Sequence, residues 1–306
     1  MKIWHRLLTL TLALLLAAPA CALGETVVTS FYPIYLFTLN LTQGVEGLEV
    51  RSLTTPGAGC LHDYQLQTGD MKALNRADLF LINGAGMEGY LAGVFDAFPE
   101  LKVVDASKGI ELLASCVEHD HDHDHDHDHG HEHEMNPHIW LDAGNAILMV
   151  QNLADGLMEA FPQHAAAIAA NREAYTARLA ALDAELKQAL SGLERRDVVT
   201  FHEAFPYFAH AYGLNVAAVL NQEPDDALSP RQLADLVRTV RQLGNPPLFV
   251  EPQFDDMAAR IIAGETGAQI FTLDPVVTAP EEGAALTHYE DAMRQNLQTL
   301  QTALAN

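Results

Sequence analysis

The feature that most constrains the fold is a pattern of short apolar segments alternating with amphipathic ones, which occurs twice along the chain. The apolar segments lie at 26–31, 48–53, 77–84 and 101–106, and again at 197–201, 215–220, 247–252 and 268–273. Strands that alternate with helices pair in parallel and are covered by helices on both faces. The pattern therefore predicts an α/β protein with two Rossmann-like lobes, each built on a parallel sheet.

One long amphipathic helix is predicted between the two halves. Its apolar side chains recur at intervals of three, four or seven residues, at Ile168, Tyr175, Leu179, Leu182, Leu186 and Leu190. This spacing gives one apolar side to a helix of roughly 30 residues, about 45 Å long. We assign 25–161 to an N-terminal lobe, 162–193 to a rigid linking helix and 196–306 to a C-terminal lobe. A ligand is expected in the cleft between the lobes, at the carboxyl ends of the strands.

The first residues have the pattern of a secretory signal peptide, 1–22. Two basic residues precede an apolar segment, 7–18, which is too short to span a membrane, and small residues follow. Cleavage is expected after Ala20 or Ala22, or lipid attachment at Cys21. The protein should therefore be exported, to the periplasm or to the outer face of the cytoplasmic membrane.

Two further cysteines, Cys60 and Cys116, would remain after export. In an oxidising compartment a disulfide between them is favoured over a pair of thiolate metal ligands, and two buried free thiols are the alternative.

An acidic, histidine-rich run, 118–134, precedes the long helix. It holds eight histidines, at His119, His121, His123, His125, His127, His129, His131 and His133. Such a composition cannot form a core, so we expect a disordered loop that binds metal ions at low affinity. The whole chain has a net charge of -24, which argues against nucleic acid as a partner and favours metal cations.

Four residues outside the run occupy loops or strand ends that face the expected cleft. His62 lies in a loop between a strand and a helix, and His138 lies in "NPHIW" ahead of another helix. His202 and Asp274 each end a predicted strand of the C-terminal lobe, in "VVTFHEAF" and "FTLDP". Three imidazoles and one carboxylate form a tetrahedral set that suits Zn²⁺, whereas Mn²⁺ prefers more oxygen ligands.

Motifs of metal-dependent or nucleophilic catalysis are absent from the sequence. Glu203 follows His202, but the HExxH pattern is not completed, and neither G-x-S-x-G nor a P-loop occurs. Glu203 is interpreted as a carboxylate that orients a metal ligand, and Glu251 as either such a carboxylate or the cap of a strand end. We expect a binding protein and not an enzyme. The competing hypothesis is a metal-binding adhesin or surface zinc buffer that acts through the histidine-rich run.

Four stretches carry a resemblance to a known family: "CLHDYQL…MKALNRADLFLINGAGME", "NPHIWLD", "VVTFHEAFPYFAHAYGL" and "FVEPQF…TGAQIFTLDP". In this order, around a histidine-rich run and a long helix, they resemble the zinc-specific solute-binding proteins of bacterial ABC importers, over essentially the whole mature chain. The resemblance implies that His62, His138 and His202 bind zinc, with Asp274 at the fourth position. The manganese branch has a carboxylate in place of His202. Leu61 stands where some zinc binders have a glutamate.

The same resemblance implies how the protein would work. Zn²⁺ would be cargo, held between the lobes and handed to the membrane permease of an ABC transporter. We expect the protein to act as a monomer.

Overall fold

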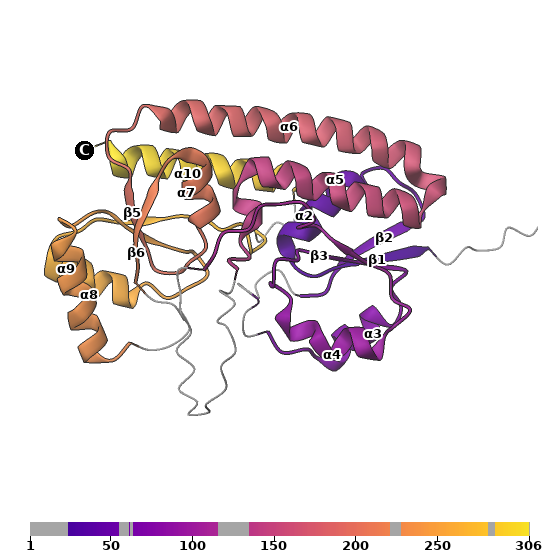
Figure 1. Cartoon of the computed structure of the whole chain (residues 1–306), viewed down its shortest axis with the longest axis horizontal. Coiled ribbons are helices and arrows are strands. Elements are labelled where there is room, and N and C mark those ends of the chain that lie inside the picture. Colours follow the sequence, from indigo (N-terminus) through magenta and orange to yellow (C-terminus); the bar gives the residue numbers. More distant parts are fainter. Residues whose placement is uncertain are drawn as a thin grey trace, which may run out of the picture.

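Two α/β lobes joined by a long helix make up the protein, as predicted (Figure 1). The computed structural model describes residues 24–54, 61, 64–115, 135–220, 228–280 and 285–305. The N-terminal lobe contains strands β1 (Glu25–Thr29), β2 (Leu48–Ser52), β3 (Leu79–Ile82) and β4 (Val103–Asp105). The C-terminal lobe contains β5 (Asp197–Thr200), β6 (Asn215–Val219), β7 (Leu248–Val250) and β8 (Ile270–Thr272). Each strand overlaps one of the eight segments predicted from the sequence.

Both sheets have the same strand order and are parallel throughout. The orders are β2-β1-β3-β4 and β6-β5-β7-β8. In each sheet the second strand along the chain lies on one side of the first strand, and the third lies on its other side. Ligands of doubly wound sheets bind at this reversal, beyond the carboxyl ends of the strands. The residues that follow β1 and β3, and those that follow β5 and β7, are therefore placed to form a site.

Helices cover both faces of the two sheets. One set comprises α2 (Tyr32–Leu41), α5 (Ala143–Ala160), α6 (Ala165–Ser191), α7 (Pro206–Tyr212) and α10 (His288–Leu304). The other set comprises α3 (Thr68–Leu74), α4 (Ala92–Ala97), α8 (Pro230–Gln242) and α9 (Met257–Thr266). Three 3₁₀ turns, η1 (Gly89–Leu91), η2 (Ile139–Leu141) and η3 (Pro162–His164), precede α4, α5 and α6. In Figure 1, α6 lies across the top of both lobes, with α3 and α4 below one sheet and α8 and α9 below the other.

Helix α6 joins the lobes through a core that they share. All six of its apolar positions predicted from the sequence are buried. They belong to one hydrophobic cluster that includes Val27 of β1, Phe208 of α7 and Leu300 of α10. Full burial of a leucine contributes about 1.5–3 kcal/mol. Six such side chains on one helix hold it against both lobes.

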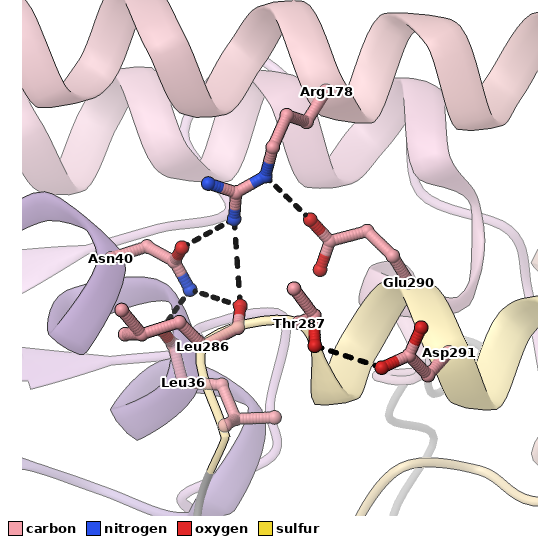
Figure 2. Close-up of polar contacts among 7 residues, drawn as sticks. All are labelled: Leu36, Asn40, Arg178, Leu286, Thr287, Glu290 and Asp291. Carbon is pink, nitrogen blue, oxygen red and sulfur yellow. Dashed lines mark hydrogen bonds and ion pairs between the residues drawn. The ribbon is translucent and has the colours of Figure 1, made fainter.

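A polar junction centred on Arg178 of α6 adds a second connection between the lobes (Figure 2). Its Nε donates to Glu290 Oε1 of α10 at 2.8 Å, and its Nη2 donates to Asn40 Oδ1 of α2. Asn40 Nδ2 in turn donates to the Leu286 carbonyl at 2.9 Å. The guanidinium also lies over the ring of Tyr175, 4.7 Å from its centroid. One side chain of the linking helix thus ties a helix of the N-terminal lobe to a helix of the C-terminal lobe.

Several predicted features lie outside the described residues: the signal peptide with Cys21, the cysteines Cys60 and Cys116, His62, and the histidine-rich run 118–134. Their expected roles remain predictions. Among the residues that are described, no helix is long and apolar enough to cross a membrane.

Candidate metal centre

His202 lies where strand β5 ends, in the middle of the C-terminal sheet. The Phe201 amide donates to the Phe249 carbonyl at 3.2 Å, so the pairing with β7 continues to the residue before His202. The His202 side chain is buried, and its ring lies 5.9 Å from that of Phe254. The sheet thus places the His202 imidazole where the strand order reverses, the point at which a ligand is expected.

His138 lies in an Asn-Pro-His turn that leads into η2 and α5. Asn136 Oδ1 accepts the backbone N–H of His138 at 2.9 Å and lies 3.1 Å from His138 Nδ1. An amide oxygen can only accept, so this contact places the imidazole proton on Nδ1 and leaves the lone pair on Nε2. Neutral imidazole with a free Nε2 lone pair is the form that binds metal ions.

The two imidazoles converge across the lobes. His138 Nε2 and His202 Nε2 are 3.3 Å apart, and the residues are only 1% and 5% exposed. Two nitrogens bound at 2.0–2.1 Å to one tetrahedral Zn²⁺ ion are about 3.3–3.4 Å apart. The spacing of the pair therefore matches that of two ligands of one zinc ion.

Asn136 also connects the His138 turn to the opposite lobe. Its Nδ2 donates to the Glu203 carbonyl at 2.9 Å, and its own carbonyl accepts from the Tyr207 hydroxyl at 2.9 Å. Glu203 Oε2 accepts from Ser115 Oγ at 2.6 Å. The residue after His202 is thus fixed to the residue two before His138, so the two imidazoles are positioned together.

Two carboxylates follow strands of the C-terminal sheet: the partly buried Asp274 comes after the edge strand β8, and the buried Glu251 comes after the inner strand β7. Asp274 accepts the Val276 amide on Oδ1 at 2.7 Å, and its own amide donates to Asn296 Oδ1 at 2.7 Å. Glu251 Oε2 accepts from Gln253 Nε2 at 2.6 Å, whereas its Oε1 has no hydrogen-bond partner among the described residues. Burial raises the pKa of Asp274, and it raises the pKa of Glu251 to about 8. A bound cation would favour the charged forms of both groups.

The predicted ligand set is brought together only in part. Within the described ranges, no three His, Cys, Asp or Glu side chains lie close enough to share a metal ion. The structure therefore unites His138 with His202, while Asp274 is not grouped with them. Leu61, next to His62, is buried in the shared core. The roles of His62 and Asp274 as ligands remain predictions.

Glu88 is another buried carboxylate, in the loop that follows β3. Its Oε1 and Oε2 accept the backbone N–H groups of Asn83 and Gly84 at 2.7 and 3.0 Å. Desolvation nevertheless raises its pKa from 4.5 to about 7. No role was predicted from the sequence for Asn83, Gly84 or Glu88, nor a hydrogen bond from Asn136 to the other lobe. The available signals were the "NGAG" turn after a strand and the asparagine two residues before His138.

The raised pKa of Glu88 predicts a pH dependence of stability in the metal-free protein. A carboxyl group whose pKa is higher in the folded state than in the unfolded state destabilises the fold when it is ionised. The free energy of unfolding therefore falls as the pH rises from the unfolded pKa to the folded pKa. The loss between about pH 5 and pH 8 should be on the order of 2–3 kcal/mol. Glu88→Gln should remove this part of the slope, measured by chemical unfolding.

Glu46→Gln, at an exposed carboxylate, is the control for that measurement and should keep the wild-type slope. Equal slopes in Glu88→Gln and wild type would contradict the assignment to Glu88.

Two lobes with parallel sheets, a long helix across both and a buried imidazole pair between them give the chain the architecture of a two-lobed solute-binding protein. A sequence family described as zinc-uptake complex component A, periplasmic, matches residues 27–303. The chain belongs to this family. Its members are binding components of an uptake complex, which agrees with the prediction that the chain is not an enzyme.

Individual relatives bind different metals. The zinc-binding protein AdcA of Streptococcus pyogenes serotype M3 is 33% identical over 287 residues, covering 90% of this chain and 55% of AdcA. The chain thus spans about half the length of that relative. The iron-binding protein YfeA of Yersinia pestis is 30% identical over 245 residues, covering 79% of this chain and 74% of YfeA.

A solved structure shares the whole two-lobed fold. The laminin-binding protein Lmb of Streptococcus agalactiae, described as a bifunctional protein with adhesin and metal-transporting activity, superposes with a TM-score of 0.74 at 28% identity. The match covers 92% of this chain and all of Lmb.

Proposed function

We propose that this protein captures Zn²⁺ with high affinity in the cleft between its lobes, outside the cytoplasm, and delivers it to the permease of an ABC importer. The observation that carries the proposal is the buried pair of His138 and His202, whose Nε2 atoms are spaced as two ligands of one zinc ion. His62 and Asp274 would complete four-coordination. Two or three imidazoles favour Zn²⁺ over Mn²⁺ and, together with the similarity to AdcA, over the iron of YfeA.

The hydrogen bonds around the pair indicate how the ion would be held and released. Asn136 keeps the Nε2 lone pair of His138 directed at His202 Nε2, and it fixes the carbonyl of Glu203, the residue after His202. Tight binding follows because little reorganisation is needed when the ion arrives. Release to a permease would require the two imidazoles to part, and this separation must break the bond between Asn136 and Glu203.

The histidine-rich run, 118–134, is proposed as an accessory site that gathers zinc at low affinity and passes it to the cleft. The described residues on either side of it lie beside the site. Ala114 and Met135 form an antiparallel bridge, and the Asn136 amide donates to the Leu113 carbonyl at 2.9 Å. Met135, which directly follows the run, is three residues before His138.

Zinc titration of the mature protein with and without residues 118–134 tests both parts of the proposal. One tight site should survive the deletion, because its ligands lie elsewhere, and the number of weakly bound ions should fall. Competition with a chelator of known affinity measures the tight site, and equilibrium dialysis measures the total. Loss of all tight binding on deletion would instead identify the run as the working part of a surface zinc buffer.

Adhesion is a second candidate function, because Lmb is described as both an adhesin and a metal transporter. Binding of the mature protein to immobilised laminin, with the run-deleted variant beside it, tests this candidate.

We further propose that the mature protein begins near Ala22 or carries a lipid on Cys21; the mass of its N-terminal peptide distinguishes the two.

A further inference from the structure

The loop after strand β3, residues 83–88, has an unusual backbone that a buried carboxylate holds in place. Gly84, Ala85 and Gly86 all have positive φ, at 77°, 54° and 86°. Alanine rarely adopts this conformation, so the loop needs compensating interactions. Glu88, only 7% exposed, supplies two of them through the Asn83 and Gly84 amides.

Gly84 also shows how closely the loop is packed. A Cβ at this position would overlap the carboxylate of Asp105 and the hydroxyl of Ser107. The loop is thus confined by Glu88 within it and by Asp105 and Ser107, at the end of β4, beside it. Such confinement fixes the position of the side chain that opens the loop, Asn83.

The Asn83 side chain reaches from this loop to the Asn-Pro-His turn. It is fully buried, and its Nδ2 donates to the Gly84 carbonyl at 2.9 Å and to the Pro137 carbonyl at 3.0 Å. Pro137 directly precedes His138, and its carbonyl also accepts the Ile139 amide at 2.8 Å. The peptide group that joins Pro137 to His138 is therefore anchored to the end of β3.

The turn has supports on two sides. Asn136 holds it to the C-terminal lobe through the Glu203 carbonyl, and Asn83 holds it to the N-terminal sheet. Without the Asn83 amide, the turn would keep only the attachments made through Asn136, about which it could pivot, and His138 Nε2 would lose its fixed separation from His202 Nε2. Residues that orient a metal-binding histidine affect affinity although they do not touch the metal.

We propose that Asn83, held in place by Glu88, is a positioning residue of the metal site, which fixes the direction of His138 through the Pro137 carbonyl. The inference rests on the proposed function of His138 as a zinc ligand. Asn83→Ala should weaken zinc binding by about 10- to 100-fold, the range seen when the partners of metal ligands are removed. The measurement is competition for Zn²⁺ against a chromophoric chelator, with the full mature chain.

Asn152→Ala is the matched control. Asn152 Nδ2 also donates to two backbone carbonyls of the same lobe, those of Ala106 and Lys108, at 2.9 and 2.8 Å. Neither carbonyl belongs to the His138 turn. This variant should lose stability in chemical unfolding but keep wild-type zinc affinity to within about two-fold. Equal weakening in Asn83→Ala and Asn152→Ala would overturn the proposal, since it would reduce the effect to general destabilisation.

The role of Glu88 is tested by a double-mutant cycle. Glu88→Gln keeps the volume of the side chain but loses one acceptor oxygen, so it should weaken zinc binding less than Asn83→Ala does. If Glu88 acts through Asn83, adding Glu88→Gln to Asn83→Ala should cost no further affinity. Fully additive losses would show that Glu88 acts by another route. If Asn83→Ala does not fold, the zinc affinity of Glu88→Gln alone tests the proposal. An unchanged affinity in Glu88→Gln would then overturn it.

His138→Ala, measured in parallel, separates this inference from the function on which it rests. Loss of the tight site in His138→Ala with wild-type affinity in Asn83→Ala would refute the positioning role and leave the function intact. Unchanged affinity in His138→Ala would refute the function itself.

Discussion

Replacing His62, His138 and His202 together with alanine is expected to abolish the tight zinc site. Apparent zinc-binding free energies of four-ligand protein sites are on the order of 10–16 kcal/mol. Each ligand then accounts for roughly 3 kcal/mol, so a single replacement should weaken binding by about 100-fold. The loss should be at least as large for His138 and His202, since they are buried and already spaced for one ion. Isothermal titration of the metal-free protein measures the effect.

His210→Ala is the control for these replacements. His210 lies on α7, eight residues after His202, but its side chain is exposed. This variant should bind zinc as wild type does. Unaltered affinity in the triple variant would rule out the proposed ligand set.

The second large effect is expected from Arg178→Met at the junction of Figure 2. Glu290 is only 3% exposed, and Arg178 is its ion-pair partner at 2.8 Å. Removing one partner of a buried pair leaves an uncompensated charge, which costs about 3–5 kcal/mol. Since the Arg178 side chain is 41% exposed, we discount this to about 2–3 kcal/mol of unfolding free energy. Chemical denaturation of the metal-free protein measures it.

Arg172→Met, on the same helix, provides the comparison. Arg172 pairs with Asp155 at 2.7 Å, but the Asp155 side chain is 67% exposed, so its loss should cost less than about 1 kcal/mol. Adding Glu290→Gln to Arg178→Met should restore part of the lost stability, because the buried charge is then gone. Similar losses in Arg172→Met and Arg178→Met would mean that the junction is no stronger than a surface ion pair.

The fold could be predicted because its signals are local. Alternation of apolar and amphipathic segments indicated all eight strands, and the spacing of six apolar residues indicated helix α6 and its buried side. The start of α8 carries a signal of the same local kind, since Ser229 and Gln232 lie within one turn and form a capping box. Hydrophobic periodicity and capping depend on neighbours within a few residues, so a single sequence carries them.

The polar contacts that support the site and join the lobes could not be predicted in the same way. Asn83 contacts a residue 54 positions away, Asn136 one 67 away, and Arg178 one 112 away. Polar residues in loops follow no period, so the sequence does not say which of many asparagines meets which carbonyl. His138 and His202 were recognisable because imidazoles in loops and at strand ends that face an expected ligand site are chemically distinctive. Their spacing of 3.3 Å is a property of the assembled lobes alone.

The core shared along α6 limits how this protein could be divided or recombined. Both lobes have the same strand order, which suggests two interchangeable modules. Yet Ile168 near one end of α6 and Leu190 near the other belong to a single buried cluster that also contains side chains of α10. A lobe produced alone would expose part of that cluster to water and would be prone to aggregate. Changes of metal specificity by engineering must therefore be made within the cleft, residue by residue, and not by exchanging lobes between relatives.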